Sequence, residues 1–275
     1  MQFGICLKLK LYKRLIQFSN AKINLGLFVG QKRPDGFHEI SSLFLPVALY
    51  DVLEAMPSER VELQSFGIPI PEGENLVTQA NKRLLERGMS RPYAWNLLKN
   101  IPIGAGMGGG SSNAASALQM MGPEQDLHDI ALELGSDVPF FFHNQLCLVQ
   151  GRGEEITPIH AEMDPFWVYI VNPGIHISTA EAYAGVDRRD VFPDILSIFK
   201  AGPSVWRAQM QNDFEHGIFR SYPEIAGIKD QLYSAGAYYA SMSGSGSTVY
   251  GFFSEKPNPI EFRSSYFQRI VRPLI

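Results

Sequence analysis

A glycine-rich segment is the first feature of the sequence that could do chemistry. Residues 101–118 read IPIGAGMGGGSSNAASAL, in which five glycines precede two serines and an alanine-rich run. Glycine loses more conformational freedom on folding than any other residue, so a run of glycines needs a reason. One reason is a bound anion, because closely spaced backbone N–H groups and the start of a helix both attract negative charge.

Three interpretations of residues 104–112 compete. A flexible linker is common for such a composition, but apolar residues are interleaved and both flanks are predicted to be regular structure. The glycines also spell G-x-G-x-x-G, a weak sign of a dinucleotide site, and no lysine precedes Ser111 as a Walker loop requires. We favour a cradle for a nucleoside triphosphate. Its residues would be Pro102, Gly104, Gly106, Gly108, Gly109, Gly110, Ser111 and Ser112.

Two charged residues also stand in unusual surroundings. Lys22 lies in the apolar run AKINLGL, and a strand interior seldom hides an ammonium group without a carboxylate nearby. Strand alternation alone would instead turn Lys22 toward solvent. Asp137 precedes Val138-Pro139, where an ordinary helix N-cap is the simplest interpretation. The residues alone leave these alternatives open.

The elements that must position these residues include both strands and helices. Alternation and turn residues predict strands at 23–30, 43–49, 51–56, 61–66, 93–98 and 166–171, and a glycine-broken hairpin at 238–253. Apolar periodicity predicts helices at 75–87, 114–121, 126–134, 178–185, 193–200 and 204–234, before a C-terminal helix or strand. Residues 1 to about 15 are expected to form an extra strand or a disordered extension. The pattern changes near residue 160, which predicts domains at 1–160 and 161–275.

Composition narrows the class of protein. A chain of 275 residues with 45% hydrophobic content can bury a large core. A net charge of −4 argues against nucleic acid or an anionic membrane as a partner, and no stretch is long and apolar enough for a membrane span. Cys6 and Cys147 make neither a disulfide framework nor a metal motif, so a cytoplasmic location is expected.

Beyond these physical signals, the glycine segment resembles the phosphate-binding motif of the GHMP kinase superfamily, which includes galactokinase, homoserine kinase and mevalonate kinase. Residues 20–25 (NAKINL) resemble its N-terminal motif, and residues 241–253 (SMSGSGSTVYGFF) resemble its C-terminal glycine motif. Residues 33–40 (RPDGFHEI) and 134–141 (LGSDVPFF) are similar to a narrower family, the 4-diphosphocytidyl-2-C-methyl-D-erythritol kinases of the non-mevalonate isoprenoid pathway. The motifs occur in the family's order.

The resemblance implies an α+β fold of two domains, with an N-terminal domain like ribosomal protein S5 domain 2, a ferredoxin-like C-terminal domain, and the active site between them. It implies phosphorylation of the substrate's 2-hydroxyl group by ATP with Mg²⁺. Asp137 would be the general base and Lys22 its partner. The metal ligands stay open, with the Ser112 hydroxyl as a candidate. The alternatives are another GHMP kinase, for mevalonate or homoserine, and a nucleotide-binding module without activity.

The resemblance also implies a set of residues that bind the cytidine diphosphate part of the substrate. Phe37 stands where the family usually has tyrosine. The phenylalanine keeps a ring that can stack on the base but lacks the tyrosine hydroxyl group. On sequence grounds alone, Phe37 could pack on its sheet, His38 could lie at the surface, Tyr183 could be helix core and Asn75 could be only an N-cap. The implied substrate residues are Asn24, Phe37, His38, Asn75, Thr179, Tyr183, Gly244 and Ser245.

Overall fold

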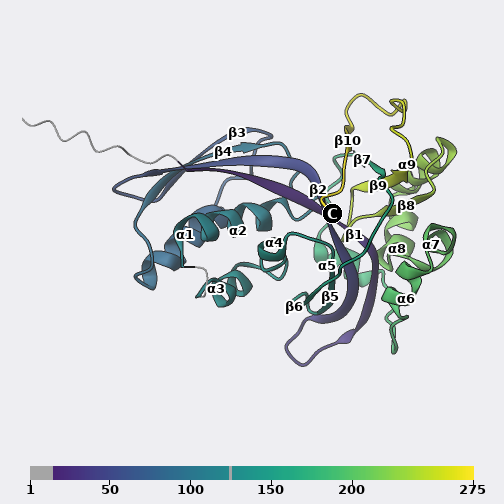
Figure 1. The fold of residues 1–275 in the computed structure, drawn as a ribbon, viewed down its shortest axis with the longest axis horizontal. Helices are drawn as coiled ribbons and strands as arrows, with labels where there is room; N and C mark the ends of the chain where they lie inside the picture. Colours follow the sequence, from purple (N-terminus) through teal and green to yellow (C-terminus); the bar gives the residue numbers. More distant parts are fainter. Residues whose placement is uncertain (1–14, 124–125) are drawn as a thin grey trace, which may run out of the picture.

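Two long strands organise the first sheet of the computed structural model, which describes residues 15–123 and 126–275 (Figure 1). β1 (Leu15–Lys32) pairs antiparallel with β2 (His38–Pro57). One end of β2 pairs with β4 (Tyr93–Lys99) and its other end with β5 (Cys147–Gly151). The two runs predicted at 43–49 and 51–56 therefore belong to one strand. The expected extension of residues 1 to about 15 falls almost wholly outside the described residues.

Two further strands complete this sheet, and helices cover one of its faces. β3 (Glu62–Gly67) and β6 (Glu155–Pro158) lie at the edges, which gives the order β3-β4-β2-β5-β6 with β1 beside β2. The sequence analysis missed both β5 and β6. The helices bury an apolar core that includes Leu53, Trp95 and Leu118. They are α1 (Leu76–Glu86), α2 (Gly109–Met121), α3 (Leu127–Leu134) and the short α4 (Phe140–His143).

The second sheet has a ferredoxin-like strand order. In chain order its strands are β7 (Trp167–Asn172), β8 (Tyr239–Met242), β9 (Val249–Phe253) and β10 (Phe267–Val271). Their spatial order is β10-β7-β9-β8, with antiparallel neighbours throughout. The fourth strand thus lies beside the first, as in a β-α-β-β-α-β unit. The crossover between β9 and β10 contains no helix, whereas the crossover from β7 to β8 is helical.

Five helices form that crossover. The sequence pattern predicted three helical stretches there, and the last of them is divided where Asn212 and Tyr222 interrupt the helices. The helices are α5 (Thr179–Ala184), α6 (Ile195–Lys200), α7 (Pro203–Gln209), α8 (Phe214–Ser221) and α9 (Pro223–Ser234). None of the described helices combines the length and apolar character needed to cross a membrane.

The two sheets share a hydrophobic core. Ile23 of β1 and Leu45 of β2 belong to the same buried cluster as Trp206 and Phe252 from the second half of the chain. Because this cluster covers β1 from the side opposite the helices, the middle of β1 is buried on both faces. A domain boundary near residue 160, in the stretch between β6 and β7, stays a prediction. Cys147 is a free buried thiol, and burial raises its pKa to about 11.

Candidate active site

The glycine segment is a loop that ends in a helix. It leaves β4 after Lys99 and enters α2 at Gly109. Gly104, Gly106 and Gly108 have φ angles of +61°, +75° and +66°, which residues with a Cβ rarely adopt. No side chain caps the start of α2, so its first N–H groups are free to bind an anion.

This loop forms one wall of a cavity of about 370 Å³, which we call the glycine-loop cavity. Ser112 lies outside it and is 2% exposed, so Ser111, rather than Ser112, offers the hydroxyl group there. Asn75 also lines this cavity while its side chain caps α1, accepting a hydrogen bond of 2.9 Å from the N–H of Val77. The predicted cradle residues on its wall are Pro102, Gly104, Gly106, Gly108, Gly109, Gly110 and Ser111.

Lys22 and Asp137 meet at one point of the molecule. The Lys22 Nζ atom lies 3.2 Å from Asp137 Oδ2, with the two side chains 4% and 33% exposed. Lys22 Nζ also donates a hydrogen bond of 2.7 Å to Asn24 Oδ1 and lies 4.2 Å from the centroid of the Phe44 ring. The ammonium group therefore contacts the Asp137 carboxylate, the Asn24 amide oxygen and the face of the Phe44 ring. Of these, the Asp137 carboxylate is the one next to solvent.

Asp137 has no capping role. It lies between α3 and α4, and the residue at the N-cap of α4 is Pro139, without a side-chain hydrogen bond. The helix N-cap interpretation of Asp137 is therefore wrong. Its carboxylate instead faces Lys22 and raises the pKa of Tyr183, although burial of Tyr183 is the larger cause of that shift.

Asp137 lines a second cavity of about 380 Å³, which we call the Asp137 cavity. Gly106, Gly108 and Ser111 line both cavities, so the glycine loop is the wall between them. A phosphate held over this wall would lie next to the Asp137 carboxylate. The predicted residues that line the Asp137 cavity are Lys22, Asn24, Phe37, Asp137, Thr179, Tyr183, Gly244 and Ser245.

Two predicted substrate residues lie elsewhere. His38 is not among the lining residues, because its ring stacks on Tyr183 at a centroid distance of 4.6 Å and its Nδ1 atom lies 3.3 Å from the Gly30 carbonyl oxygen. His38 therefore supports the wall behind Tyr183. Asn75 belongs to the glycine-loop cavity, on the other side of the loop from Asp137.

The sequence analysis did not identify Arg152, which lines the Asp137 cavity with Lys22 as its second cationic side chain. The Arg152 guanidinium group lies 4.7 Å from the centroid of the Phe37 ring. Gly151 and Gly153 flank it with φ angles of +68° and +120°. This glycine pair signals a turn, but only the pairing of β5 with β2 brings the turn to the cavity.

The C-terminal hairpin holds the glycine loop and β1 together. Ser243 Oγ donates a hydrogen bond of 2.8 Å to the Gly106 carbonyl oxygen and accepts one of 3.2 Å from the N–H of Asn24. The Tyr250 hydroxyl group donates one of 2.6 Å to the Asn24 carbonyl oxygen. Gly244 and Ser245 thus reach the Asp137 cavity on a hairpin fixed to both of its neighbours.

A buried ion pair fixes the point where the glycine loop leaves β4. Lys99 of β4 pairs with Asp51 of β2, and the two side chains are 4% and 0% exposed. Asp51 also accepts hydrogen bonds from the N–H groups of Asn100 and Ile101 and from the Asn113 amide, at 2.7, 2.9 and 3.0 Å. Burial lowers the pKa of Lys99 despite the carboxylate. Asp51 thereby ties the start of the loop to α2.

Asp51→Asn is expected to lower the free energy of unfolding by about 3–5 kcal/mol, because it leaves the Lys99 ammonium group buried without its counter-charge. Thermal or urea unfolding measures this. The lowered folded-state pKa of Lys99 means that the unfolded chain binds more protons, so the variant should gain stability as the pH rises toward the ordinary lysine value. Asp51→Asn/Lys99→Met should recover part of the loss. Equal stability of the single variant and the wild type would contradict this.

Two family models match the chain. The description of one is "GHMP kinases N terminal domain", matched by residues 75–145, and that of the other is "GHMP kinases C terminal", matched by residues 204–269. The first match contains the glycine loop and Asp137, and the second contains the hairpin that contacts the loop.

Two curated relatives share one name. A 4-diphosphocytidyl-2-C-methyl-D-erythritol kinase of Cytophaga hutchinsonii is 40% identical over 94% of this chain and 100% of the relative. Its counterpart in Porphyromonas gingivalis is 42% identical over 88% of this chain and 93% of the relative.

Solved structures agree with these relatives. A crystal structure of 4-(cytidine 5'-diphospho)-2C-methyl-D-erythritol kinase matches with a TM-score of 0.74 and 35% identity, covering 86% of this chain and 89% of that one. A homoserine kinase of C. hutchinsonii shares the fold at a TM-score of 0.69 and 15% identity, covering 100% and 99%. By its fold and its relatives, the chain belongs to the GHMP kinases, in the family of the 4-diphosphocytidyl-2-C-methyl-D-erythritol kinases.

Proposed function

We propose that this protein transfers the γ-phosphoryl group of ATP to the 2-hydroxyl group of 4-diphosphocytidyl-2-C-methyl-D-erythritol, in isoprenoid precursor biosynthesis. The observation that carries the proposal is the Lys22–Asp137 contact of 3.2 Å in a cavity that shares a glycine wall with a second cavity. The names of the relatives supply the substrate. A cytoplasmic location, where ATP is available, is part of this proposal.

Each charged group has a defined task in this reaction. The N–H groups of the glycine loop and of the start of α2 bind the phosphates of ATP. Asp137 accepts the proton of the substrate hydroxyl group as that oxygen attacks the γ-phosphorus. Lys22 stabilises the Asp137 carboxylate and the charge that develops on the attacking oxygen. Asn24 keeps the Lys22 ammonium group in place.

The residues present fit a magnesium ion held mainly by nucleotide phosphates. The described residues contain no group of three or more His, Cys, Asp or Glu side chains that could hold a metal, and Mg²⁺ in such enzymes needs only one or two protein ligands besides phosphates. The Ser111 hydroxyl group, which lines both cavities, is the protein ligand we propose. When bound, the ion neutralises phosphate charge.

The cytidine diphosphate end would occupy the outer part of the Asp137 cavity. The rings of Phe37 and Tyr183 line it and offer faces for a pyrimidine base. Arg152 supplies the positive charge that a diphosphate requires, next to Phe37. Thr179 adds a hydroxyl group at the start of α5.

Arg152→Ala is expected to raise the KM for the diphosphocytidyl substrate about 10–100-fold, because a hydrogen bond to a charged group contributes about 1.5–3 kcal/mol. The KM for ATP should change less than about twofold, since Arg152 is absent from the lining of the glycine-loop cavity. Steady-state kinetics with each substrate varied separately measure both constants. Arg152→Lys should recover part of the affinity, and a larger effect on ATP than on the alcohol would contradict the assignment.

The proposed function is tested by offering three alcohols in parallel with Mg-ATP. Product should form from the diphosphocytidyl alcohol and not from mevalonate or homoserine. Product from either of the latter, and none from the former, would overturn the substrate assignment within the GHMP kinases. Absence of product from all three, with ATP bound, would favour a nucleotide-binding module.

A further inference from the structure

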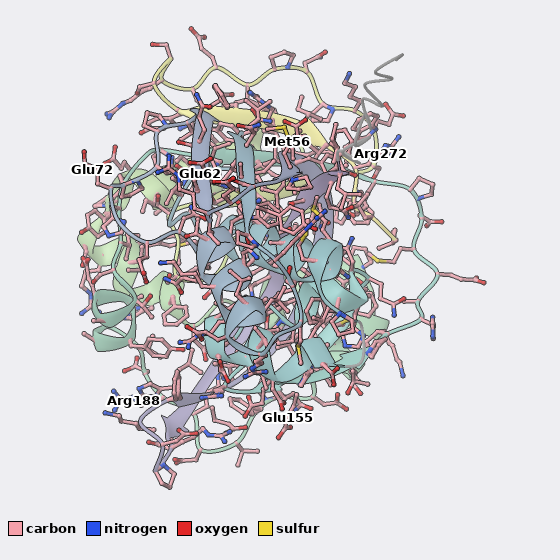
Figure 2. All side chains as sticks on the ribbon, turned by 90° about the vertical axis from the view of Figure 1, so that its left-hand side faces the viewer. Met56, Glu62, Glu72, Glu155, Arg188 and Arg272 are labelled. Carbon is pink, nitrogen blue, oxygen red and sulfur yellow. The ribbon has the colours of Figure 1, made fainter. Side chains whose placement is uncertain are left out.

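Two turns of the first sheet meet through the side chain of Arg33. Residues 33–37, which we call the hairpin turn, join β1 to β2, and residues 152–154, which we call the Arg152 turn, join β5 to β6. The end of the β1–β2 hairpin projects from the molecule in both views, and Figure 2 labels Glu155, which follows the Arg152 turn, close to this end (Figures 1 and 2). The contact between the turns is 3.6 Å, from Arg33 Nη2 to Glu154 Oε1.

Three carboxylates surround the Arg33 guanidinium group. Besides the contact with Glu154, its Nη1 atom lies 3.0 Å from Glu39 Oε2 and its Nε atom lies 3.2 Å from Asp35 Oδ2. All four side chains are partly exposed. Ion pairs of this kind add little to stability, so the fold is expected to tolerate the loss of Arg33.

The Glu154 carboxylate is folded back onto its own turn. Its Oε2 atom accepts a hydrogen bond of 2.5 Å from the N–H of Arg152. Gly151 leaves room for this arrangement, because an added Cβ would lie 2.5 Å from the same oxygen. The backbone of Arg152 and the side chain of Arg33 thus hold one carboxylate between them.

The Arg152 guanidinium group stays clear of these carboxylates. It lies 4.7 Å from the centroid of the Phe37 ring, and within residues 15–123 and 126–275 the Arg152 side chain makes no ion pair. Arg152 and Phe37 line the Asp137 cavity, whereas Arg33 and its three carboxylates do not. A guanidinium group normally pairs with a carboxylate that it can reach. The neighbouring carboxylates therefore need another cation if Arg152 is to face the cavity.

We propose that Arg33 is a positioning residue for the cytidine diphosphate end of the substrate. By neutralising the three carboxylates, it keeps them from pairing with the Arg152 guanidinium group and from repelling the diphosphate. Arg33 lies outside the cavity lining and acts through Arg152. This inference rests on the proposed function, because it requires a diphosphate to bind beside Arg152.

Backbone hydrogen bonds hold the hairpin turn without the Arg33 side chain. The N–H of Arg33 donates one of 2.7 Å to the Phe37 carbonyl oxygen, and the N–H of Gly36 donates one of 3.1 Å to the Arg33 carbonyl oxygen. Asp35 Oδ1 also accepts one of 3.1 Å from the N–H of Phe37. A substitution of Arg33 is therefore expected to change the charge beside Arg152 more than the shape of the turn.

Arg33→Met is expected to raise the Kd for CDP, used as a probe, about tenfold, and the KM for the diphosphocytidyl alcohol by a similar factor. The kcat and the KM for ATP should stay within about twofold of wild type. Calorimetric titration with CDP and steady-state kinetics measure these constants. Arg33→Lys keeps the charge without the planar guanidinium group and should lose at most about threefold in affinity.

Arg83→Met is the matched control. Arg83 also contacts two carboxylates, Glu86 at 3.1 Å and Glu133 at 3.8 Å, but it lines neither the glycine-loop cavity nor the Asp137 cavity. Its removal should leave the Kd for CDP and both KM values unchanged. An equal loss of CDP affinity in Arg83→Met and Arg33→Met would contradict a local role of Arg33.

A second substitution separates charge from structure. Glu154→Gln keeps an oxygen that can accept the N–H of Arg152 but removes the negative charge. Arg33→Met/Glu154→Gln should therefore bind CDP at least about threefold more tightly than Arg33→Met alone. Equal or weaker binding by the double variant would show that Arg33 is only a structural link between the turns, and would overturn the inference.

Failure of this inference is distinguishable from failure of the proposed function. A wild type that phosphorylates the diphosphocytidyl alcohol, together with an Arg33→Met variant unchanged in Kd and KM, would overturn the role of Arg33 alone. A loss confined to kcat in that variant would do the same. A wild type that neither binds CDP nor phosphorylates this alcohol would overturn the proposed function and the role of Arg33 with it.

Discussion

Asp137→Asn is expected to lower kcat about 10²–10⁴-fold while the KM values of both substrates change less than about threefold. The amide has nearly the shape of the carboxylate but cannot take up the proton of the attacking hydroxyl group. Lys22 keeps its contacts with Asn24 and Phe44, so the geometry of the cavity should persist. Steady-state kinetics measure the loss at a temperature where the variant is folded, because removal of the counter-charge of the buried Lys22 ammonium group should also lower the melting temperature.

Ser136→Ala is the control for this prediction. Ser136 lines the same cavity next to Asp137 but carries no group that could act as a base at neutral pH. Its removal should leave kcat within about threefold of wild type. If Asp137→Asn kept more than roughly a tenth of the wild-type kcat, proton transfer to Asp137 would not be part of the mechanism, and the contact with Lys22 would be structural.

Lys22 shows where alternation along a strand stops being informative. The pattern of β1 by itself turns Lys22 toward solvent, yet the residue is 3% exposed. Alternation predicts exposure only when one face of a strand meets water. Residues 19–30 of β1 are all buried, because α2 packs on one side of the strand and the hairpin of the second half packs on the other. A buried ammonium group in this position requires a carboxylate, and Asp137 provides it.

Local sequence signals located most helices and strands, and the missed strands are those that lack a local signal. Asn75 begins α1 and Gly122 ends α2, as their cap chemistry predicts. β5 and β6 have five and four residues and hold glycine, glutamine and glutamate, so no run of alternating apolar residues marks them. They form because β2 offers a partner strand, which a local pattern cannot reveal.

Some features of the candidate site could be predicted from local sequence, and others depend on the tertiary structure. The glycine motif predicted the glycine loop, because its residue types carry the demand for positive φ angles. Its role as an anion cradle stays a proposal. The distribution of residues between the two cavities was not available from the sequence: Asn75 lies with the glycine loop, Ser112 is buried, and Arg152 comes from a turn that strand pairing carries to the cavity. The sequence thus predicted which chemistry occurs, and the fold decides which side of the glycine loop each residue serves.

Gly106→Ala is expected to cause the largest combined loss of stability and activity. Gly106 has a φ of +75°, and an added Cβ would lie 2.0 Å from the Ser243 carbonyl oxygen. The strained backbone costs about 1–2 kcal/mol, and separation of the loop from the hairpin loses the Ser243–Gly106 hydrogen bond, about 1 kcal/mol more. We expect unfolding to become easier by roughly 3 kcal/mol, a fall in melting temperature of about 6–12 °C.

Activity should fall as well, because Gly106→Ala moves the wall between the two cavities, which in the proposed mechanism aligns the phosphate donor with Asp137. At a temperature where the variant is folded, kcat/KM should drop at least about 100-fold. Gly227→Ala in α9 is the matched control, since nothing lies within 4 Å of its added Cβ, and it should raise stability by about 0.5–1 kcal/mol. A Gly106→Ala protein that melts and turns over like the wild type would show that the hairpin does not hold the glycine loop in its catalytic position.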